Sequence, residues 1–84
     1  MGMILARITN IPGVHVVDRV IVPGGTYIKV EPDGVSVTVN LVYLDMTTET
    51  ITVTGTVQLS KRVARVIIPE REKSKFFVIE VGRS

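Results

Sequence analysis

The only histidine in the chain is His15, and imidazole is the side chain best suited to proton transfer or metal binding near neutral pH. Either role needs a partner at a suitable spacing. The nearest carboxylate in sequence is Asp18, and residues three apart on a strand face opposite ways. Six of the eight carboxylates lie in or beside predicted turns, so no paired-carboxylate hydrolase site is expected. We therefore interpret His15 as an ordinary strand residue.

Three further kinds of reactive site lack their sequence signatures. The chain has no cysteine, which excludes a disulfide, a thiolate nucleophile and a cysteine-based zinc site. Gly24 and Gly25 do not open a helix that carries Lys-Ser or Lys-Thr, so they do not form a phosphate-binding loop. The serines lack the flanking residues of a nucleophile elbow. The sequence therefore predicts no enzyme, no cofactor, no metal site and no small-molecule substrate.

Basic residues gather late in the chain, where seven of the ten lysines and arginines fall within residues 61–84. A basic face can bind phosphate groups, and the candidates for such a face are Lys61, Arg62, Arg65, Lys73 and Lys75. Recognition of single-stranded nucleic acid also needs aromatic side chains that stack on the bases. The chain has only two tyrosines and two phenylalanines. Because of the basic residues, the alternative function is that of a small β-barrel that binds nucleic acid through the basic segment 61–75.

The elements that position these side chains are predicted to be strands. Of the 84 residues, 34 are valine, isoleucine or threonine, whereas alanine and leucine together number only six. Side chains branched at Cβ lose rotamer freedom in a helix and pack well on a pleated surface. The composition therefore predicts an all-β protein.

Glycine and proline divide the chain into seven short predicted strands, at about 3–9, 14–22, 26–31, 35–44, 50–59, 62–68 and 76–81. The clearest turn is Glu31-Pro32-Asp33-Gly34, which we expect to join its two flanking strands as a hairpin. Short strands at this spacing predict an antiparallel β-sandwich or a small β-barrel of six to seven strands. Residues 1–84 are interpreted as a single β domain, because a chain of this length holds one core.

Two of the predicted strands alternate cleanly between apolar and polar residues. The apolar face of 35–44 carries Val35, Val37, Val39, Leu41 and Tyr43. In 50–59, threonines at positions 50, 52, 54 and 56 oppose apolar residues. Period-two patterning marks half-buried strands. The two strands should therefore pair as a long hairpin with one core face and one hydroxyl-rich face.

Alternation fails in the predicted strands 14–22, 62–68 and 76–81, which are apolar on both faces. Such a strand is either central in a closed barrel or covered by another chain, because a small domain has little second interior. The side chains predicted to form an interface with another chain are Val17, Ile21, Val63, Ile67, Phe76 and Val78. The alternative is a bulge that changes the phase midway along each strand.

The sequence thus predicts a non-enzymatic structural or protein-interaction module. By analogy of architecture, we expect a self-associating subunit of a larger assembly, such as a virion, tail or filament component. Its expected partners are copies of the same chain or other protein subunits. We do not expect it to bind a membrane. No apolar run is long enough to span a bilayer, and the amino terminus lacks the pattern of a signal peptide. We therefore expect the protein to be cytoplasmic or assembled into a particle.

Overall fold

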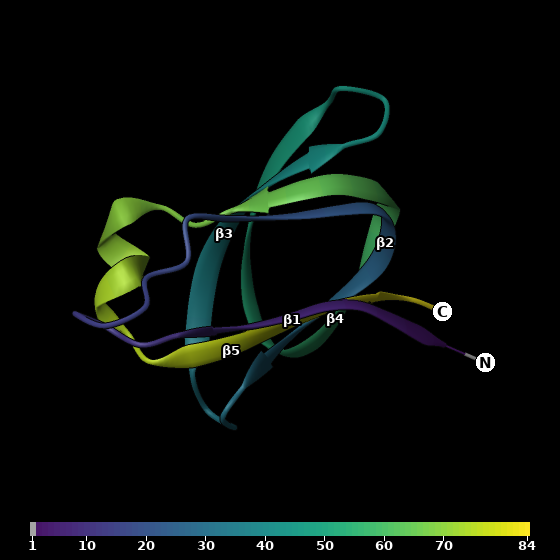
Figure 1. Ribbon diagram of the computed structural model, residues 1–84. Helices are drawn as coiled ribbons and strands as arrows, with labels where there is room; N and C mark the ends of the chain where they lie inside the picture. The colour runs from purple at the N-terminus through teal and green to yellow at the C-terminus, as the bar shows by residue number, and fades with distance from the viewer. Residues whose placement is uncertain (1) are drawn as a thin grey trace.

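The computed structural model describes residues 2–84, and these fold into an all-β structure (Figure 1). Five strands form one sheet in the order β1-β5-β2-β4-β3, and a short 3-10 helix precedes the last strand. The elements along the chain are β1 (Met3–Asn10), β2 (Arg19–Glu31), β3 (Ser36–Tyr43), β4 (Thr48–Ile67), η1 (Glu70–Ser74) and β5 (Phe77–Arg83). The prediction of an all-β protein with antiparallel pairing is confirmed.

The predicted count of six to seven strands is not confirmed, because two pairs of predicted strands are each one continuous, bent strand. β2 runs through Pro23, Gly24 and Gly25, where its pairing with β4 shifts register twice. Gly24 has a φ of 92°, a conformation that residues with a side chain rarely adopt. A bulge of this kind bends a strand and lets the pairing resume beyond it. Pro23, Gly24 and Gly25, which were predicted to separate two strands, therefore bend one continuous strand instead.

β4 is the longest strand, and different parts of it pair with β2 and with β3. Its residues 48–54 pair with β3, and its residues 55–58 pair with β2. After a bend, residues 63–67 pair with β2 on one side and with β3 again on the other. In both registers with β3 the partner numbers fall along β4 as they rise along β3, which is the antiparallel sense. β3 is therefore hydrogen-bonded to β4 along both of its edges.

The turn predicted at Glu31-Pro32-Asp33-Gly34 is present, and the Val35 N–H donates to the Pro32 carbonyl oxygen at 3.2 Å. The strands that it joins do not pair, because β4 lies between β2 and β3 in the sheet. The expected hairpin across this turn is therefore wrong. Turn residues determine where the chain reverses, whereas the neighbour that each strand takes depends on the whole core.

The hairpin predicted between 35–44 and 50–59 is confirmed. Its apolar face is turned to the core, where Val37, Val39 and Leu41 are fully buried. Its polar face carries cross-strand side-chain hydrogen bonds between Ser36 and Thr54, Thr38 and Thr52, and Asn40 and Thr50. The threonine row thus satisfies much of its own hydrogen-bonding capacity, as cross-strand hydroxyl pairs do.

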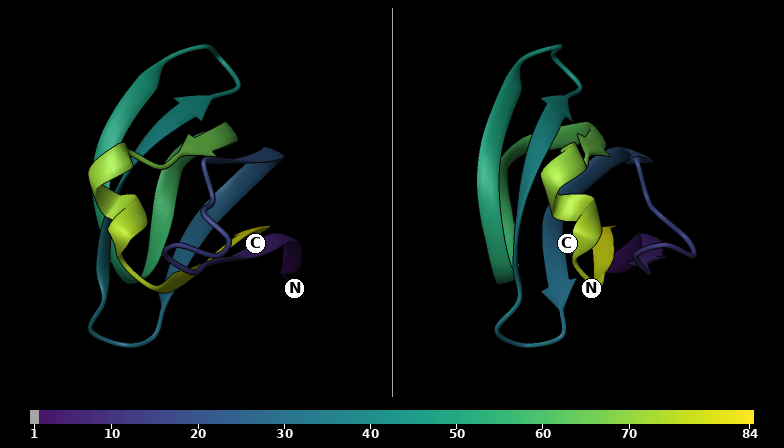
Figure 2. Two further views of the ribbon diagram at one scale, coloured as in Figure 1. Left: turned by 60° about the vertical axis from the view of Figure 1, so that its left-hand side comes forward. Right: turned by 90° about the vertical axis from the view of Figure 1, so that its left-hand side faces the viewer.

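The bent strands curl around one apolar core, and η1 lies at one end of it beside the segment 11–18 (Figure 2). Asn10 joins these parts, because its side-chain amide donates to the carbonyls of Lys73 and Lys75 at 3.0 and 2.7 Å. Its side-chain oxygen accepts the Val17 N–H at 2.8 Å. The end of β1 is therefore tied to both segments that cover the core there.

The charged segment that precedes β5 forms η1 over Glu70–Ser74. Within it, the Glu72 side chain is only 7 % exposed and lies 3.0 Å from the Lys75 ammonium. Burial opposes its charge, but the Thr38 N–H, which donates to it at 2.8 Å, and the Lys75 ammonium outweigh burial. Together they hold the pKa of the Glu72 carboxyl below its ordinary value of 4.5.

A carboxylate whose pKa is lowered by folding stabilises the protein above its unfolded pKa, and this contribution is lost as pH falls through the folded value. Glu72→Gln removes the titrating group, so the variant should be less stable than the parent chain at pH 7 by about 1–2 kcal/mol. The two free energies of unfolding should converge as pH falls below 4.5. Urea titrations between pH 2 and pH 7, followed by circular dichroism, measure this. Parallel curves would contradict it.

Candidate interaction surface

The residues with catalytic potential are dispersed. His15 is exposed and forms an isolated bridge with Ile11. Asp18 points instead to Lys73, whose ammonium lies 2.5 Å from its carboxylate and keeps the pKa of Asp18 below its usual range. Residues 2–84 contain no group of three histidine, aspartate or glutamate side chains arranged to hold a metal ion. No helix in that part of the chain has the length and apolar character needed to cross a membrane.

Most of the predicted basic segment is occupied by internal ion pairs. The Lys61 ammonium lies 3.0 Å from Asp45, and that of Lys73 contacts Glu70 at 3.0 Å as well as Asp18. Lys75 pairs with Glu72 and also donates to the Ser36 carbonyl oxygen at 3.0 Å. Arg62 and Arg65 are the members of the set that form no ion pair within residues 2–84.

The six side chains predicted to face another chain lie in three different environments. Val17 and Val63 belong to the core of the single chain, at 5 % and 0 % exposure, so they are not available for an interface. Ile67 and Val78 are half-buried. Ile21 and Phe76 are 68 % and 52 % exposed. Of the six predicted interface residues, only Ile21 and Phe76 are therefore largely exposed.

The physical reason for the placement of Val63 is a phase change in β4. Val63 pairs with Tyr43, whereas Arg65 pairs with Val42, so the strand gains one residue between them. This bulge turns both Val63 and Val66 to the core, although they are three apart. Val17 is buried for a different reason, because residues 16–18 are irregular and precede the start of β2 at Arg19.

Ile21 lies in an apolar groove of about 280 Å³ on the outer face of the sheet. Three strands build this face, because Arg65 of β4 pairs with Ile21 of β2 on one side and with Val42 of β3 on the other. The three side chains form one row across the outer surface. We call this hollow the groove, and it is lined by Ile21, Pro23, Val42, Tyr43, Leu44, Met46, Ala64 and Arg65.

The loop after β3 brings Met46 to the groove with a strained backbone. Met46 has a φ of 74°, in the left-handed region that disfavours a large side chain, and it is 82 % exposed. Its N–H donates to the Tyr43 carbonyl oxygen at 3.0 Å, and the Tyr43 N–H donates to that of Thr47 at 2.9 Å. The loop is therefore closed by backbone bonds that hold an apolar side chain outward.

Asp45 reinforces the same loop. Its carboxylate accepts bonds from the Thr47 hydroxyl at 2.5 Å and from the Thr47 N–H at 3.0 Å, and it pairs with Lys61. These contacts lower the pKa of the Asp45 carboxyl to about 2, with the Thr47 hydroxyl the largest cause. Asp45 is thus charged at neutral pH and already paired with Lys61. Arg65, which lines the groove, has no ion pair within residues 2–84.

Two further apolar regions are exposed. Met3, Ile4 and Leu5 begin β1, an outer strand of the sheet, and a bulge between Ile4 and Ala6 interrupts its pairing there. Such bulges protect an edge from pairing with other chains. The second region is formed by Val14 and Val16, which precede β2, at 80 % and 45 % exposure.

The groove was only partly predictable. Ile21 was among the predicted interface residues, whereas Val42, Leu44 and Met46 were not. The sequence does carry a signal for Val42 and Leu44, because these apolar residues continue the strand face that carries Ser36, Thr38 and Asn40. Comparison of the chain with protein-family models, with curated proteins and with solved structures found no match.

Proposed function

We propose that the protein is a non-enzymatic structural module that self-associates as a subunit of a larger assembly, such as a virion, tail or filament component. The observation that carries this proposal is the groove, where Ile21 and Met46 are both more than two-thirds exposed. Contiguous exposed apolar side chains on a small domain are typical of protein–protein contacts. The partners of the protein would be copies of this chain or other protein subunits.

The finer architecture that we propose is a small β-barrel. If β2 and β4 are each counted as two strand segments, divided at their bends, the described chain has seven strand segments. The return of β4 to the second edge of β3 supports closure of the sheet on that side. A barrel suits a subunit, because closure leaves few free edges and directs contacts to chosen faces.

Binding of nucleic acid has less support. Three of the five basic candidates, Lys61, Lys73 and Lys75, are paired with carboxylates. Neutralised cations contribute little to counterion release, which dominates binding to phosphate backbones. Arg62 and Arg65 remain, and Arg65 lines the apolar groove.

Sedimentation equilibrium between about 1 and 300 µM tests self-association. We expect an average mass that rises with concentration. Met46→Asn should reduce the association about tenfold or more without loss of thermal stability, because asparagine tolerates the left-handed conformation better than methionine does. Val14→Ser is the matched control, since Val14 is equally exposed but does not line the groove. A chain that stays monomeric over the whole range would refute the proposal.

A further inference from the structure

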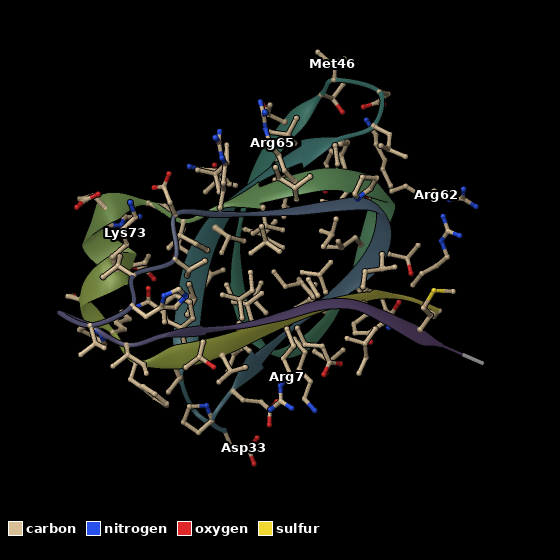
Figure 3. All side chains as sticks on the ribbon, in the orientation of Figure 1. Arg7, Asp33, Met46, Arg62, Arg65 and Lys73 are labelled. Atoms are coloured by element: carbon tan, nitrogen blue, oxygen red, sulfur yellow. The ribbon has the colours of Figure 1, made fainter. Side chains whose placement is uncertain are left out.

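Uncompensated charges of opposite sign lie at opposite ends of the molecule. At the groove end, Arg19, Arg62 and Arg65 form no ion pair within residues 2–84. Arg19 is two residues from Ile21 on β2, and the Arg62 carbonyl oxygen accepts the Leu44 N–H at 2.9 Å, so both adjoin the groove. At the other end, the exposed Asp33 carboxylate has no ion pair or side-chain hydrogen bond in the described chain (Figure 3).

We propose that copies of this chain assemble head to tail, with the loop 31–34 of one copy seated in the groove of the next. In this contact the Asp33 carboxylate pairs with the Arg65 guanidinium, and the Pro32 ring packs on the apolar lining. The inference rests on the self-association proposed above and names the two surfaces that carry it.

The shape and chemistry of the groove favour this occupant. It is small and mostly apolar, and Arg65 is one of the residues that line it. Such a site suits a small apolar side chain followed by a carboxylate, and Pro32-Asp33 offers that order on an exposed tip. A carboxylate and a guanidinium also form the strongest kind of side-chain hydrogen bond.

The loop 31–34 is already held in place. The Arg7 guanidinium lies 3.1 Å from the Glu31 carboxylate at its beginning, and the Val35 N–H closes its end on Pro32. An ordered loop loses little conformational freedom on binding, so more of the contact energy appears as affinity.

Charge also selects the symmetry of the contact. If two grooves met across a two-fold axis, the contact would bring the uncompensated Arg65 of both copies into one small interface. Like charges across an interface oppose association. A head-to-tail contact joins unlike surfaces instead, and it repeats because each copy carries both. The two surfaces lie at opposite ends in Figure 3, which favours an open filament over a compact pair.

The decisive experiment removes each charge separately and then exchanges them. Asp33→Ala and Arg65→Ala should each weaken self-association about tenfold in sedimentation velocity. An equimolar mixture of the two variants should form pairs that do not grow, because only one intact loop and one intact groove remain to meet. The double variant Asp33→Arg with Arg65→Asp should regain most of the association. Glu70→Ala, which removes an exposed carboxylate away from both surfaces, should have no effect.

The outcomes separate this inference from the function on which it rests. If the parent chain associates and both alanine variants behave like it, the head-to-tail contact is wrong while self-association stands. If Arg65→Ala weakens association but Asp33→Ala does not, the groove takes a different occupant and the contact is again wrong. If the parent chain is monomeric, both proposals fall.

Discussion

Phe77→Ala is expected to lower the free energy of unfolding by about 4 kcal/mol, because it truncates the largest fully buried side chain in the described chain. Phe77 begins β5 and pairs there with Asn10 of β1. Its removal leaves a cavity as well as losing apolar burial. A domain of 84 residues has a total stability of roughly 4–12 kcal/mol, so the variant should be barely folded at 25 °C. Urea denaturation followed by far-ultraviolet circular dichroism measures the loss.

The neighbouring residue is a matched control of the same type. Phe76 is 52 % exposed, so Phe76→Ala should cost about 1 kcal/mol or less. Phe77→Leu keeps part of the buried volume and should fold with an intermediate loss, which makes the comparison possible if the alanine variant does not fold. Equal losses at the two positions would contradict the assignment of Phe77 to the core.

Asn10→Ala is expected to cost about 3 kcal/mol, although it removes no apolar surface. The Asn10 side chain is fully buried and serves three backbone groups, those of Lys73, Lys75 and Val17. A buried backbone group left without a partner costs about 1–3 kcal/mol, with part of the loss recovered by water that enters near η1. Chemical denaturation measures the total loss of unfolding free energy. Faster hydrogen exchange of the Val17 amide would show that the loss arises at the Asn10 side chain.

The chain supplies a control for this prediction too. Asn40 is also an asparagine on a strand, but its side chain accepts a single exposed hydrogen bond from Thr50 at 2.8 Å. Asn40→Ala should therefore cost about 0.5 kcal/mol. A loss at Asn10 no larger than that at Asn40 would show that the three buried bonds contribute little.

The strand content and the main hairpin could be predicted because alternation reports burial directly. Thr50, Thr52 and Thr54 are exposed and Val53 is buried, as their positions in the pattern require. The β-branched composition likewise predicts strands without reference to any partner. These features depend on residues that are near one another in sequence.

The features that could not be predicted depend on pairing between distant segments. Nothing local distinguishes Pro23-Gly24-Gly25 as a bend within β2 from the end of a strand, because both need the same backbone freedom. The bulge that turns Val63 inward exists only in register with Tyr43 and Val42. The role of Asn10 was missed for the same reason, since its partners are more than 60 residues away at Lys73 and Lys75.

The candidate surface follows the same division. Ile21 could be found because an apolar residue on the outer phase of a strand has no place in the core of a small domain. Met46 lies in a segment of polar residues, where a single methionine carries no pattern. Only the fold of the loop over Ala64 and Arg65 brings it together with Ile21.

The path of β4 also governs how the molecule comes apart. Because this strand pairs with β2 and with both edges of β3, detachment of any one of the three breaks backbone hydrogen bonds to at least one of the other two. Local opening should therefore be confined to the periphery, and amide protons at the centre should exchange only when the whole structure opens. A domain built this way should unfold as one cooperative unit. If it assembles as proposed above, mechanical load passed between copies would reach this centre rather than a fraying strand.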